Sequence, residues 1–204
     1  MAKPASRAFR GRGILGILVY APVLVAALVC KPGLALAPPW LFVWEGCAWG
    51  LLCAGIFFRL SGIIFVGGRK GKSLVMDGPY SVSRNPIYLG SLCIGISASL
   101  FLHSLTLLGA TMVMSVMYAA LVIRAEELQL SEAFPEEWKG YASSVARVFP
   151  RRLWTHEAPS REVDLRALKN EAFRSAAALF IPWLAALLTH VRGQEWWPRL
   201  WTLP

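Results

Sequence analysis

Two polar stretches on either side of an apolar hairpin hold the residues with which this chain could do chemistry. The first covers residues 77–88 and reads D-G-P-Y-S-V-S-R-N-P-I-Y. Asn85 and Pro86 stand directly before an apolar run, and this order is typical of a helix start, with an N-cap followed by proline. The first N–H groups of a helix are free and its dipole is positive there. A helix start beside Arg84 therefore favours binding of a carboxylate or a phosphate.

Two aromatic rings flank this predicted helix start. Tyr80 and Tyr88 have faces that can stack on a base or contact a cation. The alternative interpretation is that both tyrosines and Arg84 are ordinary anchors at a membrane surface.

The second polar stretch is Arg124-Ala125-Glu126-Glu127, at the end of another apolar run. Adjacent carboxylates at a membrane surface are costly to desolvate unless they bind something. Successive helical residues point about 100° apart, so we expect at most one carboxylate to enter a pocket. The other is placed to pair with Arg124, as Glu127 is at i, i+3. The alternative is that both carboxylates are solvated.

An amphipathic helix is predicted after this carboxylate pair. Phe134-Pro135 resembles a helix start, and Phe149-Pro150 a helix end. Aromatic and β-branched residues recur between them at spacings of 3, 4 and 3, namely Trp138, Tyr141, Val145 and Val148. Their apolar stripe is expected to pack on the bilayer surface or over a pocket.

Transmembrane helices must position these stretches, because 56% of the 204 residues are hydrophobic. About 20 mainly apolar residues cross a bilayer. We predict an all-α, multi-pass protein with about five spans, the third and fourth forming a tight hairpin. The fifth is short and contains Pro182, so it could instead lie in the interface. The five runs are Gly13–Cys30, Trp40–Leu60, Ile87–Leu102, Leu105–Ile123 and Ser175–Val191.

The net charge of +9 comes from 21 Lys and Arg against 12 Asp and Glu. With five spans and an internal N-terminus, 18 of these 21 cations fall on one side. Short loops rich in Lys and Arg remain cytoplasmic. We therefore expect a cell-membrane protein whose N-terminus and polar stretches face the cytoplasm.

Two classes of partner are not expected. The basic residues do not alternate with aromatic ones along a groove-like pattern, which disfavours nucleic-acid binding. The four cysteines form no C-x-x-C pair and the three histidines are scattered, so we predict no metal site. The hydrophobic runs instead indicate contact with membrane lipids.

The order of these motifs resembles the isoprenylcysteine carboxyl methyltransferase and phospholipid methyltransferase superfamily. It comprises G-P-Y-x-x-x-R-N-P-x-Y, an apolar hairpin, E-E, a phenylalanine eight residues after the first glutamate, and a W-x-x-Y helix ending in F-P-R. The resemblance covers residues 60–151. It implies an integral-membrane enzyme that binds S-adenosylmethionine on the cytosolic side and takes its acceptor from the lipid.

The resemblance also implies which residues contact the cofactor. Carried over by position, these contacts are Lys72, Ser73, Leu74, Val75, Tyr80, Asn85, Pro86, Ile87, Tyr88 and Glu126. Combined with the helix-start argument, Arg84 joins them as a partner of the cofactor's carboxylate. Glu126 would then meet the cofactor's ammonium or ribose hydroxyls.

Three departures from the family pattern bear on the acceptor. Asn85-Pro86 replaces the His-Pro of the prenylcysteine enzymes, and the F-G-x-x-Y pattern is changed after Phe134. Val122 stands where that branch has a substrate-facing arginine, which disfavours an anionic prenylcysteine. We assign Arg124 and Glu127 as candidate catalytic residues, with Arg124 a contact for the acceptor. That acceptor is a lipid or a small apolar molecule: a phospholipid amine, a prenylcysteine-like carboxylate or a thiol.

The predicted organisation has three parts. Residues 1–60 hold a basic tail and two spans, residues 61–151 the methyltransferase-like core, and residues 152–204 a linker, the fifth span and an aromatic tail. Two other functions stay open. One is an NADPH-dependent membrane reductase of the sterol reductase type, and the other is a non-catalytic membrane protein that binds a cofactor.

Overall fold

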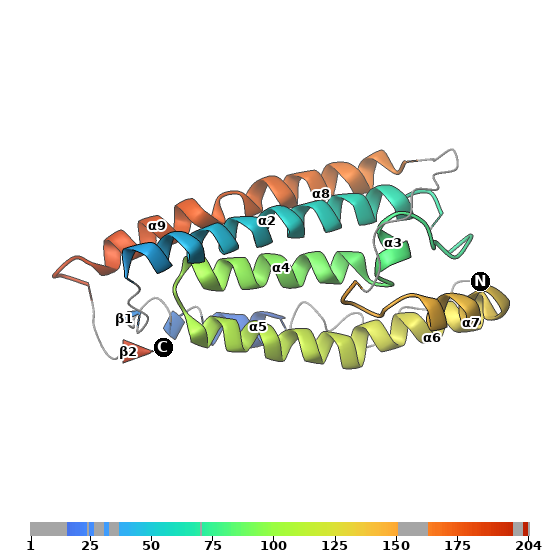
Figure 1. The fold of residues 1–204 in the computed structure, drawn as a ribbon, viewed down its shortest axis with the longest axis horizontal. Helices are drawn as coiled ribbons and strands as arrows, with labels where there is room; N and C mark the ends of the chain where they lie inside the picture. The colour runs from blue at the N-terminus through green and yellow to red at the C-terminus, as the bar shows by residue number, and fades with distance from the viewer. Residues whose placement is uncertain are drawn as a thin grey trace. The chain divides into compact units, whose positions relative to one another are not determined.

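The protein is helical almost throughout the residues that its computed structural model describes, which are 16–23, 25–26, 31–32, 37–69, 71–150, 163–197 and 202–203 (Figure 1). This confirms the predicted all-α class. The exception is a parallel pair of two-residue strands, β1 (Lys31–Pro32) and β2 (Thr202–Leu203). The chain divides into two compact units: Met1–Gly50 with Gly95–Ala125 and Phe180–Pro204, and Leu51–Ile94 with Glu126–Leu179.

Three helices in the described part of the chain are long and apolar enough to cross a membrane. The first is α2 (Pro38–Val66). The second runs from α5 (Leu105–Met117) through the π-helix η1 (Tyr118–Ile123) into α6 (Arg124–Ala133). The third joins α8 (Leu165–Ala178) and α9 (Ile181–Arg192).

The predicted count of about five spans is therefore only approximate. Helix α4 (Pro86–Phe101) coincides with the third predicted span, but its 16 residues are fewer than the roughly 20 that cross a bilayer. In the predicted first span, Gly13–Cys30, residues 16–23 and 25–26 are helical, and the others lie outside the described residues.

The helical segment that contains the fifth apolar run begins at Leu165, ten residues before the predicted Ser175. Asp164 caps α8, since its side chain accepts hydrogen bonds from the backbone N–H groups of Arg166 and Ala167, both at 3.0 Å. Pro182 falls in the first turn of α9, where a missing N–H leaves no hydrogen bond unmade. The apolar run is therefore interrupted at Leu179 and Phe180, directly before the helix that contains Pro182.

The predicted hairpin between α4 and α5 is confirmed. His103 takes a positive φ of 49° in the turn. Ser104 then caps α5 by accepting a hydrogen bond from Leu107 N at 3.2 Å. The two helices pack closely, because a Cβ atom added at Gly95 of α4 would lie 2.8 Å from Thr111 of α5.

The predicted amphipathic helix is five residues too long. Helix α7 covers Pro135–Ser144, and Val145 is already extended, with φ −112° and ψ 134°. The chain leaves the helix because the next two carbonyls hydrogen-bond elsewhere: Ala146 O accepts from Arg84 N, and Arg147 O accepts from the Asn85 side chain, both at 2.9 Å. Val145 and Val148 therefore lie outside α7 and, contrary to the prediction, do not extend its apolar face.

Glycines bring α2 and α4 together in the second unit. A Cβ at Gly55 would lie 2.6 Å from Ile94, and one at Gly62 would lie 2.6 Å from Ile87. A Cβ at Gly90 would likewise approach Arg59 to 2.6 Å. Contact of this kind between helix backbones is typical of membrane helices, and it fixes the start of α4 against the end of α2.

Candidate functional site

The start of α4 lies where the sequence predicts it. Pro86 is the first helical residue, and Asn85 O accepts a hydrogen bond from Leu89 N at 3.0 Å. Asn85 is only 8% exposed. Its side-chain nitrogen donates to Arg147 O at 2.9 Å and reaches Glu127 Oε1 at 3.5 Å. The segment after α7 is thereby held against the helix start.

Glu127 is the buried carboxylate of the pair, with 7% of its surface exposed. Its Oε2 lies 2.8 Å from Arg147 Nη2, and its Oε1 lies 3.4 Å from Arg84 Nε. The predicted ion pair between Glu127 and Arg124 is wrong. Glu127 pairs with Arg84 and Arg147 instead, and Arg124 is exposed.

Arg84 lies between this carboxylate and an aromatic ring. Its guanidinium carbon is 5.5 Å from the centre of the Trp138 ring, and its side chain is 12% exposed. Two guanidinium groups therefore share one carboxylate. The resulting surplus of one positive charge lies beside the start of α4, where the helix dipole is positive, and the two together favour an anion.

Glu126 hydrogen-bonds across to α4. The Tyr88 hydroxyl donates to Glu126 Oε1 at 2.9 Å, and both side chains are half-buried. The two neighbouring carboxylates thus have different environments: Glu127 forms ion pairs with two arginines, whereas Glu126 accepts a hydrogen bond from a phenol. Both carboxylates contact α4 or the residues just before it, and that at most one of them enters a pocket stays a prediction.

Two tyrosines, the half-buried Tyr80 and the buried Tyr141, complete the cluster. Tyr141 of α7 donates to the carbonyl oxygen of Tyr80 at 2.9 Å, and Tyr80 of the short helix α3 (Pro79–Val82) donates to Gly62 O at 3.4 Å. Burial raises the pKa of the Tyr80 hydroxyl, and the negative charge of Glu126 raises it further. Burial likewise raises the pKa of Tyr141. Both hydroxyls stay protonated at neutral pH and act as donors.

The loop implied by the family resemblance runs from an exposed to a buried end. Lys72 and Ser73 are exposed, Leu74 is half-buried and Val75 is only 7% exposed. Arg69 closes the loop, because its Nη2 donates to Asp77 Oδ1 at 2.8 Å. The ammonium group of Lys72 is thus accessible to a ligand, whereas the Val75 end of the loop is buried.

The second unit thus brings together most of the predicted site. The exception is Arg124, which belongs to the other unit. The sequence did not single out Arg147, although it forms the shortest ion pair to Glu127. A lone arginine in a segment predicted as helix gives no signal for this role. Trp138 was expected only as part of an apolar stripe, and it also faces Arg84.

Residues 45–137 match the family model for phospholipid methyltransferases. This segment, which is less than half of the chain, is similar to the phospholipid methyltransferase domain. This domain includes α4, Glu126 and Glu127, and it ends before Arg147. The family supports a membrane methyltransferase.

Two curated proteins with sequences similar to this chain are named for metal resistance. The nickel-cobalt-cadmium resistance protein NccN of Alcaligenes xylosoxydans xylosoxydans is 29% identical over 147 residues, which cover 72% of this chain and 68% of that protein. The cobalt-zinc-cadmium resistance protein CzcN of Cupriavidus metallidurans is 36% identical over 94 residues. That match spans 46% of this chain and 43% of CzcN. No solved structure is significantly similar to the chain.

Proposed function

We propose that this protein is an integral-membrane methyltransferase that transfers a methyl group from S-adenosylmethionine to a lipid or small apolar acceptor. One observation carries the proposal: the family-matched segment contains both the start of α4 and the Tyr88–Glu126 contact. In the proposed orientation this end of the helices faces the cytoplasm of a cell membrane.

The residues present fit an amino-acid cofactor that carries both charges. Glu126 offers a carboxylate to an ammonium group or to ribose hydroxyls. The α4 N–H groups and the surplus charge of Arg84 and Arg147 favour a carboxylate. Tyr80 and Tyr88 supply aromatic faces, and the loop Lys72–Val75 supplies backbone groups beside them.

S-adenosylmethionine supplies an activated methyl group, so the protein's own task is alignment of the acceptor and exclusion of water. Glu127 acts as a positioning residue in this proposal, because its charge is taken up by Arg84 and Arg147. That role replaces its assignment as a catalytic residue. Arg124, which is exposed, remains our candidate for contact with the acceptor.

Calorimetry with the detergent-purified protein tests the cofactor assignment. We expect S-adenosylmethionine and S-adenosylhomocysteine to bind below millimolar concentration and NADPH not to bind. Binding of NADPH alone would overturn the proposal in favour of a reductase. Transfer of labelled methyl groups into fractionated membrane extract then tests catalysis, and binding without any transfer would indicate a non-catalytic protein.

Glu126 and Glu127 should respond differently to removal. Glu126→Gln is expected to weaken S-adenosylmethionine binding at least about tenfold, the loss of one charge-assisted hydrogen bond, with little change in thermal stability. Glu127→Gln should mainly lower stability, because Arg84 loses its buried partner. Calorimetry and thermal unfolding of both variants measure the two effects. Equal losses of affinity in the two variants would contradict the division of roles.

The names NccN and CzcN describe resistance and no reaction. If this chain has a role in metal resistance, we propose that the role results from methylation of its acceptor. Among the described residues, no group of three or more His, Cys, Asp and Glu side chains is placed to hold a metal ion.

A further inference from the structure

One arginine, Arg59 of α2, joins three helices of the second unit. Its Nε donates to Glu171 Oε1 of α8, and its Nη2 donates to Glu171 Oε2 at 2.9 Å. Its Nη1 donates to the Ser91 hydroxyl of α4. Figure 1 shows the second half of α2 beside α8. All three nitrogens of this guanidinium group therefore donate within the protein, and both oxygens of Glu171 accept from it.

The pair of Arg59 and Glu171 lies within candidate membrane spans. Glu171 is only 2% exposed, and the side chain of Arg59 is 18% exposed. Ionisable residues in spans are costly to hold and commonly mark functional sites. Two parallel hydrogen bonds to a carboxylate fix the plane of a guanidinium group. The Nη1 atom that contacts Ser91 is therefore held in one place, which suits the pair to fixing helices.

Ser91 connects Arg59 to the first turn of α4. Its hydroxyl accepts from Arg59 and donates to Ile87 O, four residues earlier, at 2.9 Å. The aliphatic part of Arg59 lies against the same turn, because a Cβ at Gly90 would be 2.6 Å from Arg59 Cγ. Ile87 packs on α2 in the same way, 2.6 Å from a Cβ added at Gly62. A shift of α4 along α2 would therefore break the hydrogen bond between Arg59 and Ser91.

The same turn of α4 belongs to the candidate cofactor site. Ile87 and Tyr88 are two of the cofactor contacts that the family resemblance implies, and Tyr88 donates to Glu126 at 2.9 Å. Group transfer depends on alignment, and a displacement of about 1 Å can lower a rate on the order of 100-fold. Whatever fixes this turn therefore also fixes the geometry of the proposed reaction.

We propose that Arg59 is a positioning residue for the candidate cofactor site. Anchored on Glu171 of α8, it holds the first turn of α4 through Ser91. The inference rests on the proposed function, and it adds a residue that acts on the site without contacting the cofactor. Helix α8 lies outside the family-matched segment 45–137, so the carboxylate that anchors Arg59 comes from beyond that segment.

The variant Ser91→Ala tests this link, with Ser99→Ala as its matched control. Both serines donate to the carbonyl four residues earlier in α4, Ser99 to Gly95 O at 2.8 Å, so each variant loses one such hydrogen bond. Ser91→Ala also loses the bond from Arg59. In calorimetry with the detergent-purified protein, we expect Ser91→Ala to weaken S-adenosylmethionine binding about fivefold and Ser99→Ala to leave it unchanged. Equal affinities in the two variants would overturn the proposed link.

The double variant Arg59→Leu with Glu171→Leu separates positioning from stability. A packed apolar pair often matches a buried ion pair, so its thermal unfolding should stay close to that of the unmodified protein. This variant has no donor for Ser91, and we expect its affinity for S-adenosylmethionine to fall about fivefold as well. Normal stability together with normal affinity would show that the ion pair is only a structural support, and would refute the positioning role.

Hydrogen exchange separates this inference from the proposed function, because it needs no cofactor. Backbone amides at the start of α4 should exchange about fivefold faster in Ser91→Ala than in Ser99→Ala. Unchanged exchange with unchanged S-adenosylmethionine affinity would refute the role of Arg59 and leave the methyltransferase intact. If the unmodified protein binds no S-adenosylmethionine while Ser91→Ala still exchanges faster, the proposed function fails and the hold of Arg59 on α4 stands.

Discussion

Replacing Glu171 with alanine is expected to lower the free energy of unfolding by about 3–5 kcal/mol, the usual cost of removing one partner from a buried ion pair. Arg59 would keep its charge, with a side chain only 18% exposed, and would retain Ser91 as a partner. The measurement is denaturation of the detergent-solubilised protein followed by tryptophan fluorescence.

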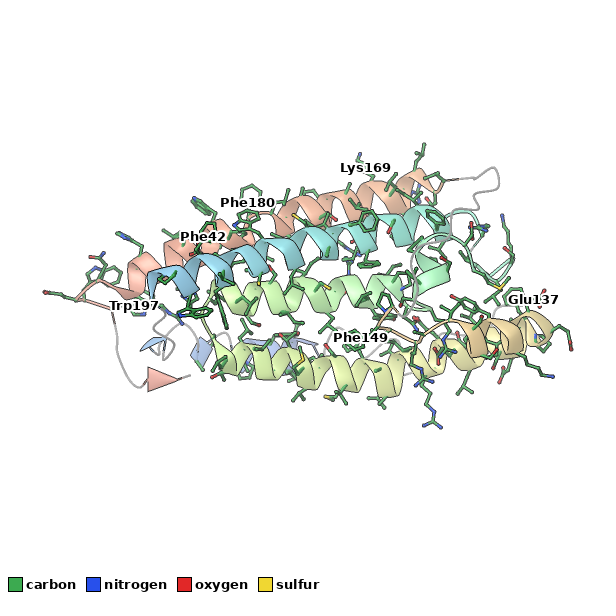
Figure 2. The ribbon with its side chains drawn as sticks, viewed as in Figure 1. Phe42, Glu137, Phe149, Lys169, Phe180 and Trp197 are labelled. Carbon is green, nitrogen blue, oxygen red and sulfur yellow. The ribbon has the colours of Figure 1, made fainter. Side chains whose placement is uncertain are left out.

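Two further variants make the Glu171 result specific. Glu137→Ala removes a carboxylate that lies exposed on α7, as Figure 2 shows, and should change stability by less than about 0.5 kcal/mol. The double variant Arg59→Leu with Glu171→Leu should recover most of the loss, because a well-packed apolar pair often equals a buried ion pair. A Glu171→Ala variant as stable as Glu137→Ala would show that the pair contributes nothing.

Replacing Gly78 with alanine is expected to destabilise the protein by about 3–5 kcal/mol, through backbone strain and overpacking together. Gly78 has φ 59° and ψ −129°, a conformation that only glycine adopts readily. A Cβ there would also lie 1.7 Å from the Phe65 ring. Pro79 and Tyr80 follow directly, so the strain would reach the candidate site.

Gly71 provides the matched control for Gly78. It also has a positive φ, 76°, but a Cβ there would meet nothing within 4 Å. Gly71→Ala should therefore cost only about 1–2 kcal/mol, the price of a left-handed backbone alone. Thermal unfolding of the two variants measures the difference. Equal destabilisation would mean that contact with Phe65 is not what fixes this turn.

Much of the site could be predicted because its signals are local. The Asn85-Pro86 pair marks a helix start by the geometry of those two residues alone, and α4 begins there. The hairpin at His103-Ser104 likewise follows from two polar residues between apolar runs, with Ser104 as the cap. Signals of this kind need no knowledge of the rest of the chain.

Contacts between distant segments could not be predicted in the same way. The partners of Glu127 are Arg84, 43 positions before it, and Arg147, 20 positions after it. The local rule for helices instead pointed to Arg124 at i, i+3. It fails because Glu127 is buried beside Arg84 and Arg147, whereas Arg124 is exposed.

Sequence by itself determined which segments are helical and apolar, where α4 starts and which residue types gather at its start, because these depend on composition and near neighbours. Tertiary structure alone decided that α7 ends at Ser144, that Arg147 takes Glu127, and that Arg59 reaches Glu171 across 112 positions. The physical reason is that a buried charge must find a partner wherever the packed helices bring one within reach. That choice is not encoded in any single stretch of the chain.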